Sequence, residues 1–94
     1  MRKYELVLVF SPETSSENQK KLVSKLKSLI EKAKGKIGKS DEWGKRELAY
    51  PIKKFSEGVY FLLNLELPVD VPAELEKKIK LEEDVIRYLL VRKE

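Results

Sequence analysis

The order of strand-like and helical segments is the feature that most limits how this chain of 94 residues can fold. Apolar runs with strand character alternate with two stretches whose apolar residues recur at helical period. The order β-α-β-β-α-β predicts an α+β fold with a four-stranded antiparallel sheet and two helices packed on one face. The expected strands are residues 3–10, 37–52, 59–67 and 85–91, and the expected helices run from about residue 14 and from residue 70.

Local signals predict where the two helices begin and end. Thr14 and Glu17 have the spacing of a capping box, so the first helix is expected to start at Thr14. Gly35 is expected to end it as the residue after the C-cap. Asp70 and Pro72 have the character of a second helix start, because aspartate caps helices and proline fits their first turn.

The second strand-like segment is long and interrupted. Gly38 and Gly44 break its pattern, which predicts bulges or a bend in a projecting arm. Residues 53–58 are expected to be a turn after this arm. The sequence contains no internal repeat or interdomain linker, so residues 1–94 are expected to form one domain.

Composition excludes much familiar chemistry. The chain has no cysteine and no histidine, so disulfides, thiolate or imidazole metal ligands and Ser-His-Asp triads are excluded. No metal or cofactor is expected. No apolar run reaches the length of about 18 residues that a membrane helix needs, so no membrane partner is expected. The net charge of +4 is compatible with a polyanionic partner.

Alternation along the strands predicts which face the helices cover. One set of alternating positions is entirely apolar or aromatic, so it is expected to face the helices. The opposite set mixes charged and apolar residues and is expected on an uncovered face. The first set is Tyr4, Leu6, Leu8, Phe10, Val59, Phe61, Leu63, Leu65, Leu67, Ile86, Tyr88 and Leu90.

The uncovered face is expected to carry an apolar patch. A patch of this kind is typical of a binding surface, although β-branched residues also occur there simply because they favour strands. We interpret it as a surface for a protein partner. Its members are Val7, Val9, Tyr60, Leu62, Leu89 and Val91.

Catalysis is not expected. Neighbouring carboxylates such as Asp41 and Glu42 fall in predicted arms and loops without an apolar pocket around them, which favours plain solvation. A small acyl-phosphate hydrolase of the same topology needs an arginine in its anion loop, and residues 11–16 contain none. An RNA-recognition motif is disfavoured as well, because Glu57 and Val59 stand where its basic and first stacking residues belong.

Four segments resemble the family of bacterial small-subunit ribosomal protein six across essentially the whole chain. The most specific of them is the Arg-Glu-Leu-Ala-Tyr-Pro-Ile stretch within residues 44–52. The others are residues 2–5, Gly58 with the aromatic strand after it, and residues 85–88.

The resemblance implies a ferredoxin-like fold and a non-catalytic ribosomal role in the cytoplasm. Members of the family bind the central domain of the small-subunit ribosomal RNA together with the eighteenth small-subunit protein. The patch would then dock that protein, and the isolated chain is expected to be a monomer. The RNA contacts implied on the residues of this chain are Arg2, Lys3, Tyr4, Lys45, Arg46, Tyr50, Lys53, Lys54, Arg87 and Arg92.

Two alternatives stay open at this point. The first is a self-associating or metabolite-binding module of the same fold, in which uncovered faces pair. The second concerns the first helix, whose lysines form either a solvated surface or a nucleic-acid contact.

Overall fold

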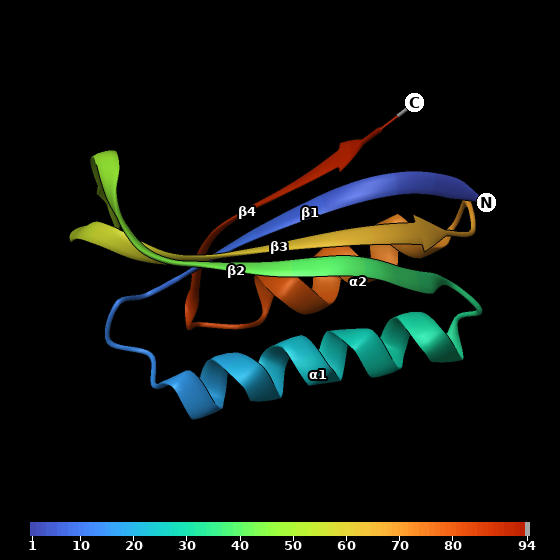
Figure 1. The fold of residues 1–94 in the computed structure, drawn as a ribbon, viewed down its shortest axis with the longest axis horizontal. Helices are drawn as coiled ribbons and strands as arrows, with labels where there is room; N and C mark the ends of the chain where they lie inside the picture. Colours follow the sequence, from blue (N-terminus) through green and yellow to red (C-terminus); the bar gives the residue numbers. More distant parts are fainter. Residues whose placement is uncertain (94) are drawn as a thin grey trace.

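Two helices lie on one side of a four-stranded antiparallel sheet in the computed structural model, which describes residues 1–93 (Figure 1). The predicted α+β, ferredoxin-like arrangement is confirmed. Glu94, the last residue of the domain expected over residues 1–94, lies outside the described residues. The elements are β1 (Arg2–Phe10), α1 (Ser16–Lys32), β2 (Lys36–Ile52), β3 (Phe55–Leu67), α2 (Val71–Lys80) and β4 (Val85–Arg92).

The strands lie in the order β2-β3-β1-β4, so β1 and β3 are central and β2 and β4 are the edges. Leu6 lies opposite Leu63 of β3 on one side and Leu90 of β4 on the other. All three belong to the set predicted to face the helices. The three strands that carry the predicted apolar patch are therefore neighbours, as expected from the topology.

The core fills the layer between this face of the sheet and the helices. Phe10 and Phe61 meet edge to face, with ring centroids 5.3 Å apart and an interplanar angle of 82°. Each helix contributes a stripe of apolar residues at helical spacing, and this stripe packs against the sheet. The principal buried side chains are Leu6, Leu8, Phe10, Leu22, Leu26, Ile30, Leu63, Leu65, Leu67, Leu75 and Ile79.

The ends of α1 differ from the sequence prediction by one residue. Ser15, not Thr14, is the N-cap, and its hydroxyl accepts a hydrogen bond from the Asn18 backbone N–H at 3.1 Å. At the other end Lys34 adopts the left-handed conformation, with φ of 67°, and Gly35 follows it. Gly35 is needed for space, because a Cβ there would lie 2.8 Å from the Ile30 Cγ2 atom.

The turn expected over residues 53–58 is much shorter than predicted. Only Lys53 and Lys54 lie between Ile52 and Phe55, which pair across the hairpin. Both lysines have positive φ, 49° and 73°, which is the conformation that a two-residue hairpin turn requires. The predicted turn was too long because Phe55, Glu57 and Gly58 pair with β2 and belong to β3.

The bulges predicted in the arm are present. The pairing of β2 with β3 shifts register after Ile37, after Glu42 and after Glu47. Each bulge increases local twist. Figure 1 shows the β2 end of the hairpin turning away from the helix layer.

One further bulge overturns part of the face assignment. The register of β1 with β4 shifts between Val9 and Phe10, so that Phe10 pairs with Val85 rather than Ile86. Val85 consequently joins the core, whereas Ile86 lies near Gly58 and Val9 on the opposite face. The strict alternation expected for these two residues fails because one extra residue in β4 reverses the face of the strand residues that precede it.

Candidate binding face

The sheet face opposite the helices is organised as rows of side chains that cross the strands. Residues opposite each other in a ladder point to the same side, so the pairing register defines each row. The rows toward the arm are largely apolar, and those toward the start of β1 are more polar. In the order β3, β1 and β4, the first two rows are Tyr60-Val9-Arg87 and Leu62-Val7-Leu89, and the third is Asn64-Glu5-Val91.

The apolar rows form the part of this face that is available for docking. Leu89 keeps 51% of its surface exposed, and no helix lies over it. The six residues predicted for a protein partner lie on this face, across three adjacent strands. A hollow of about 200 Å³ runs along it, lined by Val7, Val9, Tyr60, Arg87, Tyr88 and Leu89.

Val9 lies on the predicted face but is more buried than its neighbours there. It is only 2% exposed, although no helix covers it. Gly58 explains this burial, because a Cβ at that position would lie 2.4 Å from the Val9 Cγ1 atom. Val9 therefore packs against the backbone of β3 and lines the floor of the hollow.

The other end of the face is polar and internally paired. Lys93 Nζ lies 3.2 Å from the Glu5 carboxylate. The Asn64 side-chain amide donates to the Lys39 carbonyl at 3.1 Å. These contacts satisfy polar groups within the chain, so a partner at this end meets polar side chains that are already paired.

Trp43 belongs to the face and was missed by the sequence analysis. Its ring stacks on Tyr60, with centroids 6.3 Å apart and planes inclined by 18°. The guanidinium carbon of Arg46 lies 5.5 Å from the centroid of the Trp43 ring. The β2 register shift between Glu42 and Gly44 places Trp43 here, and alternation alone gives no sign of it.

The residues that the resemblance implied for RNA do not form one patch. Tyr4 packs against the helix-side core, and Lys45 pairs with Val59 on that same side of the sheet. Arg46 lies beside Trp43, and Tyr50 is exposed on the arm. The remaining members are exposed: Arg2 and Lys3 at the start of β1, Lys53 and Lys54 in the hairpin turn, and Arg87 and Arg92 on β4.

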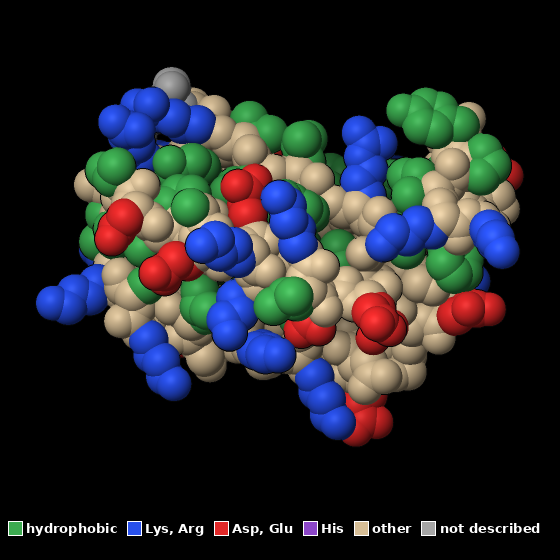
Figure 2. Space-filling model, turned by 180° about the vertical axis from the view of Figure 1, so that it is seen from behind, with side chains coloured by type: hydrophobic (Ala, Val, Ile, Leu, Met, Phe, Trp, Pro, Cys, Tyr) green, Lys and Arg blue, Asp and Glu red, His purple; other side chains and the backbone are tan. Residues whose placement is uncertain are grey.

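Figure 2 shows the molecule from behind. The upper outline dips between the C-terminal end of the chain and the β2–β3 arm, and both hydrophobic and basic side chains border the dip. The open face is thus shallowly hollowed in this view, with basic side chains near both ends of the dip. This shape suits a partner surface better than it suits a small enclosed molecule.

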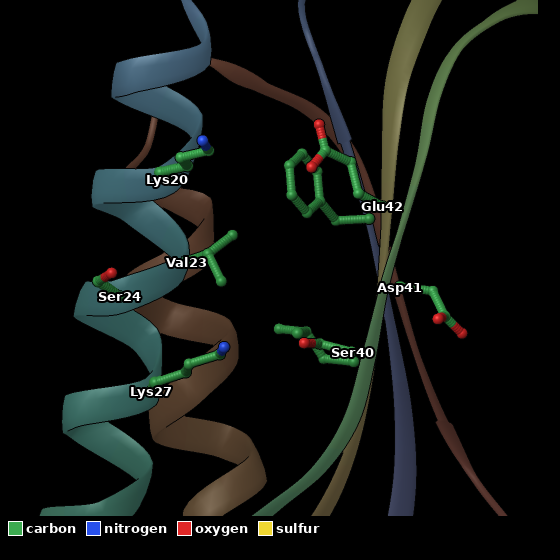
Figure 3. Close-up of a pocket in the computed structure, with 9 residues that line it drawn as sticks. Lys20, Val23, Ser24, Lys27, Ser40, Asp41 and Glu42 are labelled. Atoms are coloured by element: carbon green, nitrogen blue, oxygen red, sulfur yellow. The ribbon is translucent and has the colours of Figure 1, made fainter.

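A second hollow, of about 350 Å³, lies between α1 and β2 (Figure 3). Lys20 and Lys27 reach over it from the helix, Glu42 points toward the helix, and Asp41 points away. Its floor is formed by core side chains, including Phe61. Because its charged walls carry both signs, the hollow lacks the one-signed lining that selects an anionic ligand.

Metal and membrane features are missing from the described part of the chain. Across residues 1–93, no group of three potential acidic, cysteine or histidine ligands is close enough to hold a metal ion. No helix within residues 1–93 is long and apolar enough to cross a membrane.

The fold and the bare face together define a class: a small ferredoxin-like protein with one uncovered sheet surface. The family model of ribosomal protein S6 matches residues 3–92. The chain belongs to the ribosomal protein S6 family. The predicted resemblance to that family is therefore confirmed.

Individual relatives agree over nearly the full length. Small ribosomal subunit protein bS6 of Caldanaerobacter subterraneus subsp. tengcongensis is 47% identical over 92 residues, covering 98% of this chain and 97% of that protein. The protein of the same name from Clostridioides difficile is 44% identical, covering 97% and 98%. The crystal structure of 30S ribosomal protein S6 from Thermotoga maritima superimposes with a TM-score of 0.91 at 34% identity, covering 98% of this chain and 87% of that one.

Proposed function

We propose that this chain is a structural component of the small ribosomal subunit. In this role it binds the central domain of the small-subunit ribosomal RNA together with the eighteenth small-subunit protein, in the cytoplasm and without catalysis. Membership of a ribosomal protein family supports the assignment. The relatives named above carry small-subunit names.

One observation carries the protein-binding part of the proposal. Leu62, Val7 and Leu89 form a continuous row across three strands that the chain's own helices leave uncovered. Burial of apolar surface contributes about 25 cal/mol per Å², so a partner laid across this row gains a substantial driving force. Trp43, Tyr60 and Arg46 extend the row with residue types that are enriched in interface hot spots.

A matched pair of leucine variants tests this docking. Leu89→Asp places a carboxylate in the row, whereas Leu81→Asp places one on a leucine that is 76% exposed at the end of α2. We expect Leu89→Asp to weaken binding of the partner protein more than about tenfold, because burying an unpaired charge is costly. Leu81→Asp should bind as the wild type does. Equal binding by both variants in calorimetry contradicts the docking surface.

The RNA part of the proposal rests on exposed arginines of β1 and β4. Arg2 and Arg87 lie exposed on these strands, and exposed guanidinium groups can hold phosphate oxygens. We expect the double variant Arg2→Ala with Arg87→Ala to bind a central-domain RNA fragment more weakly and with a shallower salt dependence. Each duplex phosphate contact contributes about −0.9 to the slope of log K against log salt. Unchanged affinity and slope would contradict these contacts.

The rival reading is a self-associating module whose uncovered faces pair. Sedimentation of the isolated chain distinguishes this self-associating module from the proposed docking of a different protein. A monomer at all concentrations supports the proposed docking of a different protein, and a dimer that Leu89→Asp dissociates supports the rival.

A further inference from the structure

A hollow of about 290 Å³ lies where the hairpin turn, the end of α2 and the start of β4 come together. The hairpin turn is far in the sequence from the end of α2 and the start of β4, so only the fold brings Lys53 close to the other two segments. This hollow is separate from the hollow along the open face, although Arg87 and Tyr88 line both. Its lining consists of Lys53, Ile79, Lys80, Val85, Ile86, Arg87 and Tyr88.

The charge of this lining has a single sign. Lys53, Lys80 and Arg87 each come from a different segment, and among residues 1–93 no carboxylate lines the hollow. Glu82 is the acid nearest to Lys80 in the sequence, but it pairs with Lys25 of α1 at 3.2 Å. The hollow between α1 and β2 differs in this respect, since Glu42 stands among its lysines.

The floor of the hollow strengthens the effect of these charges. Ile79, Val85 and Ile86 are buried apolar residues of the core and its margin. A cleft with walls of one charge and an apolar, low-dielectric floor concentrates the electrostatic potential at its mouth. The arrangement therefore favours an anion over a neutral or cationic ligand.

The backbone at Lys53 gives an independent reason to look for a use of this side chain. Lys53 and Lys54 occupy the two central positions of the hairpin turn with positive φ, where glycine or asparagine fits with less strain. Strained conformations of ordinary residues cluster at functional sites. The last turn of α2 also carries Lys77 and Lys78, as expected at a helix C-terminus, but only Lys80 of the three reaches the hollow.

We infer that this hollow seats a phosphodiester group of an RNA strand. The inference deepens the proposed function and rests on it. Arg87 supplies a planar fork suited to two phosphate oxygens, and the two lysines supply mobile point charges. It adds Lys80 to the RNA contacts and makes Lys53, rather than its neighbour Lys54, the contact from the turn.

Charge-matched variants on α2 test the inference. Lys80→Gln and Lys77→Gln remove the same charge from exposed positions of the same helix, but only the first removes it from the hollow. Binding of a central-domain RNA fragment is measured with the partner protein present, over a series of salt concentrations. We expect Lys80→Gln to weaken binding about three- to tenfold and to make the salt slope shallower by about 0.7 to 0.9. Lys77→Gln should stay within about twofold of the wild type.

The outcomes separate this inference from the function on which it rests. Failure of the wild type to bind the RNA contradicts the proposed function itself. Wild-type binding with equal effects of Lys80→Gln and Lys77→Gln contradicts the hollow alone. Circular dichroism of both variants confirms that each is folded, which is expected because both lysines are exposed.

Inorganic phosphate distinguishes a strand phosphate from a free anion. Amide resonances of Lys53, Lys80 and Arg87 are followed by NMR while phosphate, and then the RNA fragment, are added. If these amides shift when RNA is added but not when phosphate is added, the site needs an RNA strand. If they shift with either addition, the site binds phosphate in general. No shift at these amides with RNA overturns the inference.

Discussion

The two faces of this sheet are made from neighbouring residues of the same strands, yet they have opposite roles. Leu62 and Leu63 are consecutive leucines of β3. Leu63 is fully buried under the helices, whereas Leu62 lies half-buried in the row of the uncovered face. The apolar character of a strand residue therefore does not decide whether it stabilises the fold or remains available to a partner. That difference comes from where the helices lie.

Truncating each leucine in turn probes the difference between the two faces most strongly. We expect Leu63→Ala to lower the free energy of unfolding by about 2–5 kcal/mol, because it leaves a cavity in a packed core. Leu62→Ala should cost less than about 1 kcal/mol in the isolated chain, since its surroundings are partly solvent. Urea denaturation measures both. Comparable losses would mean that the open face is as tightly packed as the core.

Gly58→Ala tests whether the floor of the open face is as closely packed as the structure indicates. The new methyl group would collide with Val9, because a Cβ on residue 58 would lie 2.4 Å from the Val9 Cγ1 atom. We expect a loss of about 1–3 kcal/mol, which is typical of overpacking. Combining Gly58→Ala with Val9→Ala should recover part of the loss. A neutral effect of Gly58→Ala contradicts the close contact between β1 and β3.

Trp43→Ala should loosen the arm without disturbing the core. Its stack on Tyr60 and its contact with Arg46 are the aromatic contacts that join β2 to the open face. Stacked aromatic pairs contribute about 0.5–1.5 kcal/mol beyond their buried area. We expect faster amide hydrogen exchange in the arm and unchanged exchange in α1. Trp43→Phe, which keeps a ring, is the matched control and should restore most of the protection.

Lys54→Gly is expected to have the smallest effect, and in the opposite direction. Lys54 has φ of 73°, which glycine adopts without the clash of a Cβ. The gain is partly offset by the greater freedom of glycine in the unfolded chain, so we expect a net stabilisation of up to about 1 kcal/mol. Thermal unfolding measures it. A lower melting temperature would show that the lysine makes a stabilising contact in the turn.

Much of the fold was predictable, because strand alternation and helical period are strong local signals. The six elements, the adjacency of three strands and the face covered by the helices all follow from them. One failure occurred where a single extra residue changes the geometry, because Ile86 and Val85 exchange faces at the β1–β4 bulge. Another is local, because the hydroxyl of Ser15, next to Thr14, makes the N-cap hydrogen bond.

The candidate site was predictable only in part. Val7, Leu62 and Leu89 were placed on the open face by alternation, and the structure puts them there. Trp43 was missed because it sits at a register shift, and Lys80 was missed because nothing in a helix sequence shows which of several lysines faces a hollow.

Periodicity and short motifs along the chain were enough to establish the element order, most of the helix-facing apolar set and the family. The folded arrangement was needed to show that Val9 is buried at the floor of a hollow, that Trp43 joins the open face, and that Lys53, Lys80 and Arg87 surround one hollow. Those outcomes depend on bulges and on the packing of segments remote in sequence, where the position of a side chain is set by its neighbours in space.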